Sequence, residues 1–137
     1  MSDHVREVRV LTLEAAKTMA AAAEAFAVAL GWTVAIAVVD PSGGLILLHC
    51  LDDTQPASHR IAVEKARTAA LMRRPTQSLD DAITGGRPAF LSLGAVMLGG
   101  GLPVRVDGQV VGAIGVSGMT SAKDADVADA GVQAIQG

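Results

Sequence analysis

The chain has 137 residues, half of them hydrophobic, a formal net charge of −3 and a single cysteine. The acidic balance and an aromatic content of only 2% disfavour a nucleic-acid partner, which usually requires a basic face and aromatic platforms. No apolar run approaches the roughly 20 residues that cross a bilayer, and Cys50 has no second cysteine for an intramolecular disulfide. We expect one cytoplasmic domain over residues 1–137 that forms homo-oligomers.

The order of apolar runs, turn residues and helix breakers predicts a mixed domain. It indicates an arm or strand over residues 1–11, a helix over 13–30, strands over 32–39 and 45–51, a helix over 57–73, a short helix over 78–85, a strand over 90–98, strands on both sides of 107–108, and a helix from 121 to about 135. These elements predict an α+β fold in which helices flank one antiparallel sheet of about five strands.

Capping residues place the starts of the helices. Thr12 can cap the N–H groups of the first helix. Ser78 with Asp81 resembles a capping box and predicts the start of the short helix. Ser121 with Asp124 has the same pattern and predicts the start of the last helix.

The glycine-rich segment near the C-terminus contains the clearest turn signal. Asp107-Gly108 lies between two Val-rich runs, which predicts a two-residue hairpin because both residues tolerate positive φ. Gly112 and Gly115 interrupt the second strand, so we expect a helix or a ligand to approach its backbone closely. Residues 99–101 form a candidate pocket wall with bare N–H groups, or a flexible lead-in to an edge strand.

The histidines and the cysteine limit the metal chemistry. His4, His49 and His59 are scattered without a partner cysteine pair, so a structural zinc site is not expected. His49 and Cys50 are neighbours on a predicted strand and should point to opposite faces. Of the two, we expect Cys50 to be buried as a small hydrophobic residue.

Polar residues also gather near the start of the second helix. Ser58 and His59 lie where free N–H groups favour an anion, and Lys65 and Arg67 follow on the same helix. They could hold a carboxylate, or they could form a solvated polar face. Asp52 precedes this helix and could act as a base, or as a capping and turn residue.

Several segments together resemble the GlcG/HbpS-like family, which includes the C-terminal domain of PduO-type corrinoid adenosyltransferases. The segments are 34–44 (ending Asp-Pro-Ser-Gly-Gly), 58–69 (Ser-x-x-Ile-Ala-x-x-Lys-Ala-x-Thr-Ala), 74–76 (Arg-Pro-Thr), 100–104 (Gly-Gly-Leu-Pro-Val) and 107–118 (Asp-Gly-x-x-Val-Gly-Ala-Ile-Gly-Val-Ser-Gly), followed by Asp124. The resemblance implies a profilin- or PAS-like fold, homo-oligomers, and either heme binding or degradation or a cofactor-free tautomerase activity.

Three functions remain open at this point. The first is a binding module for heme or a related flat ligand in a surface or inter-subunit groove, with His49 or His59 on the iron. The residues alone identify no cofactor, and heme is the one that the resemblance implies. The second is a cofactor-free tautomerase or isomerase of an unsaturated oxo-carboxylic acid, in which Lys65 stabilises an enolate and His59 or Asp52 moves the proton. Its assigned ligand-binding residues are Gly99, Gly100, Gly101, Ser58 and Arg67. The third is an accessory oligomeric scaffold.

Overall fold

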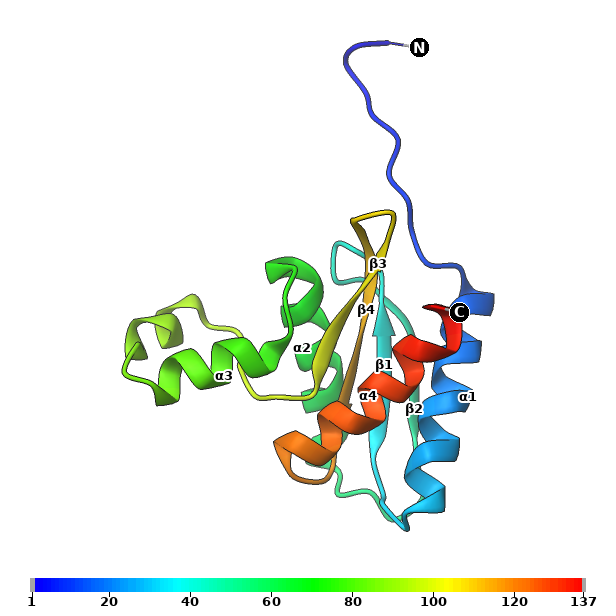
Figure 1. Cartoon of the computed structure of the whole chain (residues 1–137), viewed down its shortest axis with the longest axis vertical. Coiled ribbons are helices and arrows are strands. Elements are labelled where there is room, and N and C mark those ends of the chain that lie inside the picture. The colour runs from blue at the N-terminus through cyan, green and yellow to red at the C-terminus, as the bar shows by residue number, and fades with distance from the viewer. Residues whose placement is uncertain (1, 137) are drawn as a thin grey trace.

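The computed structural model describes residues 2–136, which form four α-helices, one 3₁₀ helix and four strands (Figure 1). In chain order they are α1 (Leu13–Ala29), β1 (Ala35–Val39), β2 (Leu45–Cys50), α2 (Ala57–Met72), α3 (Thr76–Thr84), the 3₁₀ helix η1 (Pro88–Leu93), β3 (Gly101–Val106), β4 (Gln109–Ser117) and α4 (Ser121–Gln136). The strands form one antiparallel sheet in the order β2-β1-β4-β3. The α+β class is confirmed.

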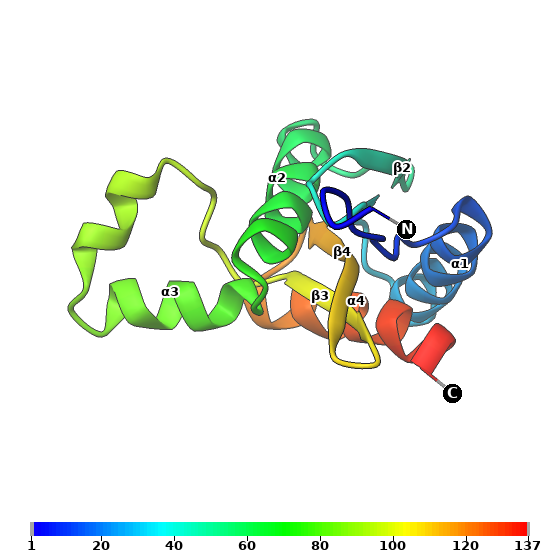
Figure 2. The same cartoon turned by 90° about the horizontal axis from the view of Figure 1, so that it is seen from above.

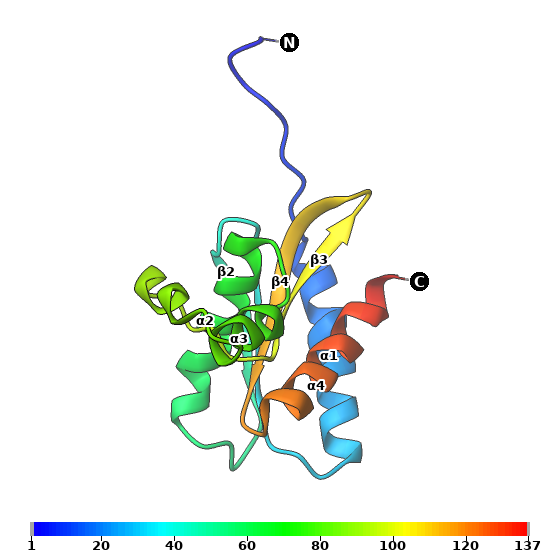
Figure 3. The same ribbon diagram turned by 60° about the vertical axis from the view of Figure 1, so that its left-hand side comes forward.

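Helices cover both faces of the sheet. Helices α1 and α4 pack together on one face, and α2 lies on the other (Figures 1 and 3). The central strand β1 is buried along its whole length because it serves two cores. Ile36 and Val38 belong to the core beneath α1 and α4, whereas Ala35, Ala37 and Val39 pack against α2.

The core beneath α2 is built almost entirely from alanine. Ala62, Ala66 and Ala69 of the helix pack on small residues of β1 and β4. A Cβ added to Gly115 of β4 would come closer than 3.0 Å to backbone atoms of Ala62 and Ala66. This confirms that something approaches the glycine-containing strand closely, and the neighbour is helix α2.

Two local predictions near the chain's turns are confirmed. The Ala15 N–H donates to the Thr12 hydroxyl at 3.0 Å, so Thr12 caps α1. Asp107 and Gly108 have φ values of 51° and 78° and join β3 to β4 in a tight turn.

The predicted strand over 90–98 is wrong, and the sheet has four strands instead of five. The 3₁₀ helix η1 occupies the first part of this segment, starting at Pro88 and ending at Gly94 with a φ of 71°. Proline sets a helical φ and lacks an N–H, which favours a helical turn over a strand. Leu91 and Leu93 are exposed, so their apolar character does not indicate burial in the sheet.

The predicted starts of two helices also need correction. Helix α3 begins at Thr76, two residues before the predicted cap, and the Ser78 hydroxyl instead donates to the Pro75 carbonyl at 2.6 Å. Helix α4 is capped by Thr120 instead of Ser121, because the Thr120 hydroxyl accepts from the Lys123 N–H at 3.3 Å. In both cases the capping pattern identifies the helix but misplaces its first turn by one or two residues.

Two segments project from this framework. Residues 2–12 form neither helix nor strand and lead away from the sheet (Figure 1). Near the end of this segment, the Leu11 N–H donates to the carbonyl of Val111 in β4 at 2.9 Å. Helices α3 and η1 extend sideways beyond α2 (Figure 2). No helix among residues 2–136 is long and apolar enough to cross a membrane.

Candidate functional site

His49 lies on the edge strand β2 and faces helix α1. Its Nδ1 is 2.5 Å from Oε1 of Glu24 on α1, and its side chain is 43% exposed. The neighbouring Cys50 packs against the alanine core on the α2 side, where burial raises the pKa of its thiol. The two side chains therefore point to opposite faces, as predicted. Cys50 is only partly buried, so the expectation of a buried cysteine holds in part.

A hollow of about 360 Å³ lies beside the Glu24–His49 pair. We call it the α1–β2 groove, and its lining residues are Val28, Gly31, Trp32, Thr33, Leu51 and Asp52. Val28 is one helical turn beyond Glu24, on the same face of α1. Leu51 is two residues beyond His49, and the alternation of an extended chain puts both on one face. Glu24 and His49 do not line the groove themselves, but each is close in the chain to a residue that does.

The groove combines an apolar wall with charged groups at its rim. Trp32 is half-buried and meets Phe26 edge to face, with ring centroids 6.2 Å apart. The Lys123 Nζ lies 5.2 Å from the centre of the Trp32 ring. Asp52 is exposed at the rim. The groove therefore offers an apolar surface with the Lys123 cation beside its tryptophan, and His49 lies outside its lining.

Lys65, the proposed enolate stabiliser, forms a buried ion pair. Its Nζ donates to the Asp124 Oδ2 and to the Val116 carbonyl, each at 3.0 Å, and both charged side chains are at least 97% buried. The other Asp124 oxygen accepts the Met119 N–H at 2.9 Å. Burial raises the pKa of Asp124, and the Lys65 ammonium opposes this increase.

Residues 99–101, the proposed pocket wall, pass between helices and are buried. The Gly99 N–H donates to Asp80 at 3.1 Å, and the Gly101 N–H donates to the Thr76 hydroxyl at 2.8 Å. A Cβ at Gly100 would lie 3.0 Å from the Lys65 Nζ. Two of the N–H groups assigned to ligand binding are therefore already bonded within the fold.

The other proposed site residues are spread over different faces. His59 and Lys65 are six residues apart on α2, which turns them about 120° from each other, and His59 is exposed. Ser58 is buried and accepts from the Ser117 hydroxyl at 3.4 Å. Arg67 pairs with Glu64 at 3.3 Å.

The contacts of Lys65 bear on the tautomerase hypothesis. That mechanism requires Lys65 to face a ligand together with His59 or Asp52. Lys65 instead has Asp124 and the Val116 carbonyl as its partners, and Asp52 lies in the α1–β2 groove. The hypothesis stays a prediction that no contact among residues 2–136 favours.

Comparisons with known proteins agree with this fold. A family model described as "Haem degrading protein HbpS-like" matches residues 11–133. The chain belongs to the HbpS-like family. It is 43% identical over 109 residues to Protein GlcG of Escherichia coli, which covers 79% of this chain and 81% of GlcG.

Solved structures extend the comparison to the HbpS-like fold. Streptomyces reticuli HbpS, solved as a double mutant, is 32% identical with a TM-score of 0.92, covering 100% of this chain and 94% of HbpS. The structure of a PduOC:heme complex is 29% identical with a TM-score of 0.84, covering 93% of this chain and 96% of PduOC. A protein of the same fold has therefore been captured with heme.

The sequence analysis missed the residues that surround His49 in this HbpS-like chain. Glu24 is an acidic residue within an alanine-rich stretch of α1, and its four-residue spacing to Val28 marks one helix face. That spacing was the only local signal that Glu24 and Val28 share a face of the helix. Its pairing with His49 spans 25 positions and depends on how α1 packs against the sheet. No group of three or more His, Cys, Asp or Glu suited to a metal ion occurs in the described part of the chain.

Proposed function

We propose that this HbpS-like protein binds heme in the α1–β2 groove, with His49 as the axial ligand to the iron. The observation that carries the proposal is the contact between Glu24 and the His49 Nδ1. A carboxylate on Nδ1 fixes the ring and directs the Nε2 lone pair outward, the arrangement that metal-ligating histidines usually have. The 43% exposure of His49 leaves that nitrogen accessible.

The residues of the groove suit a flat, partly anionic ligand. Val28, Trp32 and Leu51 offer apolar surface for a macrocycle. Lys123, held beside the Trp32 ring, supplies a cation for one of the carboxylates of heme. Heme would supply the redox and oxygen chemistry of iron, and the protein would supply the ligand, the apolar wall and the counter-charge.

The exposed apolar surface next to the groove supports a homo-oligomer. Phe26, Val28 and Leu30, at the end of α1, are 37%, 65% and 50% exposed. We propose that a second copy of the chain covers this surface and closes the groove over the ligand. Light scattering with and without hemin measures the assembly, and a monomer in both states would contradict this part of the proposal.

Hemin titration followed by absorption spectroscopy tests the ligand. We expect saturable binding of one hemin per subunit with a sharp Soret band. His49→Ala should abolish or shift that band because the iron loses its axial ligand. Glu24→Gln should weaken binding by about 10–100-fold, the usual effect of losing an outer-shell partner of a metal ligand.

His59→Ala is the matched control, because His59 is exposed on α2, on the other face of the sheet. It should bind hemin as the unmodified protein does. If His59→Ala loses the band and His49→Ala keeps it, the iron ligand is His59 and the α1–β2 groove is not the site. Weak binding that is equal in all proteins would contradict the heme proposal itself.

A further inference from the structure

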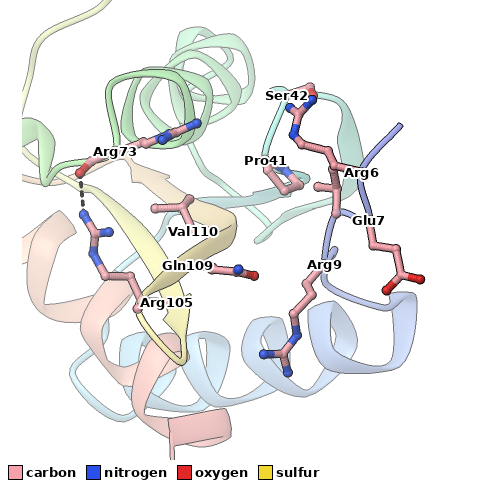
Figure 4. Close-up of a pocket in the computed structure, with 11 residues that line it drawn as sticks. Arg6, Glu7, Arg9, Pro41, Ser42, Arg73, Arg105, Gln109 and Val110 are labelled. Atoms are coloured by element: carbon pink, nitrogen blue, oxygen red, sulfur yellow. Dashed lines mark hydrogen bonds between the residues drawn. The ribbon is translucent and has the colours of Figure 1, made fainter. Parts of the chain in front are cut away.

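A second cavity, of about 440 Å³, lies at the end of the sheet opposite the α1–β2 groove. Four segments meet there: the N-terminal arm, the β1–β2 turn, the β3–β4 turn and the C-terminal end of α2 (Figure 4). The strand register places the two turns at the same end, since Val39 pairs with both Leu45 and Ala113. Its volume is in the range of small-molecule sites.

The lining of this cavity is strongly basic. Its charged residues are Arg6, Arg9, Arg73, Arg105 and Glu7. Four of the chain's eleven Lys and Arg residues therefore gather around one hollow, although the protein as a whole carries a formal charge of −3. Like charges that share a cavity repel one another, and an anion between them would relieve that repulsion.

Two of the four arginines are anchored by the fold. The Arg105 guanidinium donates to the Arg73 carbonyl at 2.6 Å (Figure 4). That carbonyl is accessible because Arg73 ends α2 in the left-handed conformation, with a φ of 54°. Arg9 pairs with Asp107 at 2.7 Å, an exposed contact that contributes little to stability.

The other two arginines have no acidic partner. Within residues 2–136, no carboxylate lies within 4.0 Å of the guanidinium of Arg6 or Arg73. Figure 4 shows the Arg73 side chain and the Gln109 amide extending toward the hollow, which Arg6 and Ser42 also line. Amide and hydroxyl groups can complete the hydrogen bonding of an anion that two guanidinium groups hold.

We propose that this arginine cavity binds a small organic polyanion, a compound with at least two carboxylate or phosphate groups. Arg6 and Arg73 bind its acidic groups, because the planar guanidinium matches both carboxylate and phosphate with paired hydrogen bonds. Arg105 neutralises the negative end of α2, so that end does not repel the ligand. The proposal is independent of heme binding, since the two sites share no residue.

Isothermal titration calorimetry with citrate and, separately, pyrophosphate tests the proposal at constant ionic strength. We expect saturable binding of at least one of the two probes. Binding of citrate alone identifies a polycarboxylate site, and binding of pyrophosphate alone identifies a phosphate site. Arg73→Gln and Arg6→Gln should each lower the affinity by about tenfold or more, since each removes a charged hydrogen-bonding group.

Arg60→Gln is the matched control, because Arg60 is an exposed arginine of α2 outside the cavity, and it should retain full affinity. Circular dichroism of each variant checks that it folds. If Arg73→Gln fails to fold, Arg6→Gln still tests the site, since Arg6 lies in residues 2–10 of the arm, which are exposed and belong to no core. Binding of neither probe, or equal loss in all three variants, would overturn the proposal.

Discussion

Replacing Lys65 with Met is expected to lower the free energy of unfolding by about 3–5 kcal/mol. The methionine side chain fills the space of the lysine stem, so the loss comes from electrostatics instead of packing. Without the ammonium, Asp124 stays buried with the backbone N–H groups of Met119 and Gly118 as its donors and no positive charge beside it. A buried charge that loses its partner costs far more than an exposed pair that is broken.

Urea denaturation of the two proteins measures this loss. Lys17→Met is the matched control, because Lys17 is exposed on α1 and has no ion pair among the described residues, and its change should stay within about 0.5 kcal/mol. Replacing Lys65 and Asp124 together by Met and Leu removes both charges, so most of the lost stability should return. Equal stabilities of Lys65→Met and Lys17→Met would show that the pair contributes nothing.

The destabilisation by Lys65→Met should also depend on pH. Burial raises the pKa of Asp124 and Lys65 lowers it, so the folded-state pKa rises further when Lys65 is absent. The unfolded chain then releases this proton at a lower pH than the folded chain does. The unfolding free energy of the variant therefore falls as the pH rises above 3.8, the ordinary pKa of Asp. Denaturation at pH 4 and pH 7 should give the larger loss at pH 7.

The Lys65–Asp124 pair explains why Lys65 and the glycines at 99–101, which the sequence alone presented as a possible active site, lie close together. It joins α2 to the first turn of α4, and Gly100 packs directly against its ammonium. A glycine run next to a lysine has the residue types of an oxyanion site. In this protein the same residues close the gap between two helices and the sheet.

The reliable sequence predictions were those that depend on neighbouring residues. Thr12 predicts the start of α1 because its own hydroxyl bonds to the first turn of the helix. Asp107-Gly108 predicts a hairpin because these two residues themselves adopt the positive φ that the turn requires. Both signals act over three residues or fewer, so no tertiary context is needed to interpret them.

The predictions that failed, and the contacts that were missed, depend on distant parts of the chain. Segment 90–98 is apolar enough for a strand, but the edges of the sheet are β2 and β3, and it pairs with neither. The Glu24–His49 and Lys65–Asp124 contacts span 25 and 59 positions. A single sequence contains no local signal for such pairs, although they determine which residues are exposed to a ligand.

Gly115→Ala should lower the free energy of unfolding about as much as Lys65→Met does, by about 3 kcal/mol or more. The added Cβ would meet the backbone of α2 at Ala62 and Ala66, where no flexible side chain can move aside. The helix would have to shift outward, and the alanine core beneath it would lose its close packing. No backbone strain adds to this cost, because Gly115 is not among the residues with positive φ.

Gly108→Ala separates that packing cost from backbone strain. Gly108 has a φ of 78° but no atom within 4 Å of an added Cβ, so its replacement should cost about 1–2 kcal/mol through strain alone. Thermal and urea unfolding of the two variants measures the difference. If Gly115→Ala were no less stable than Gly108→Ala, the close approach of α2 would not be what requires glycine in β4. On the heme proposal, the folded fraction of Gly115→Ala should still bind hemin, because no residue of α2 lines the α1–β2 groove.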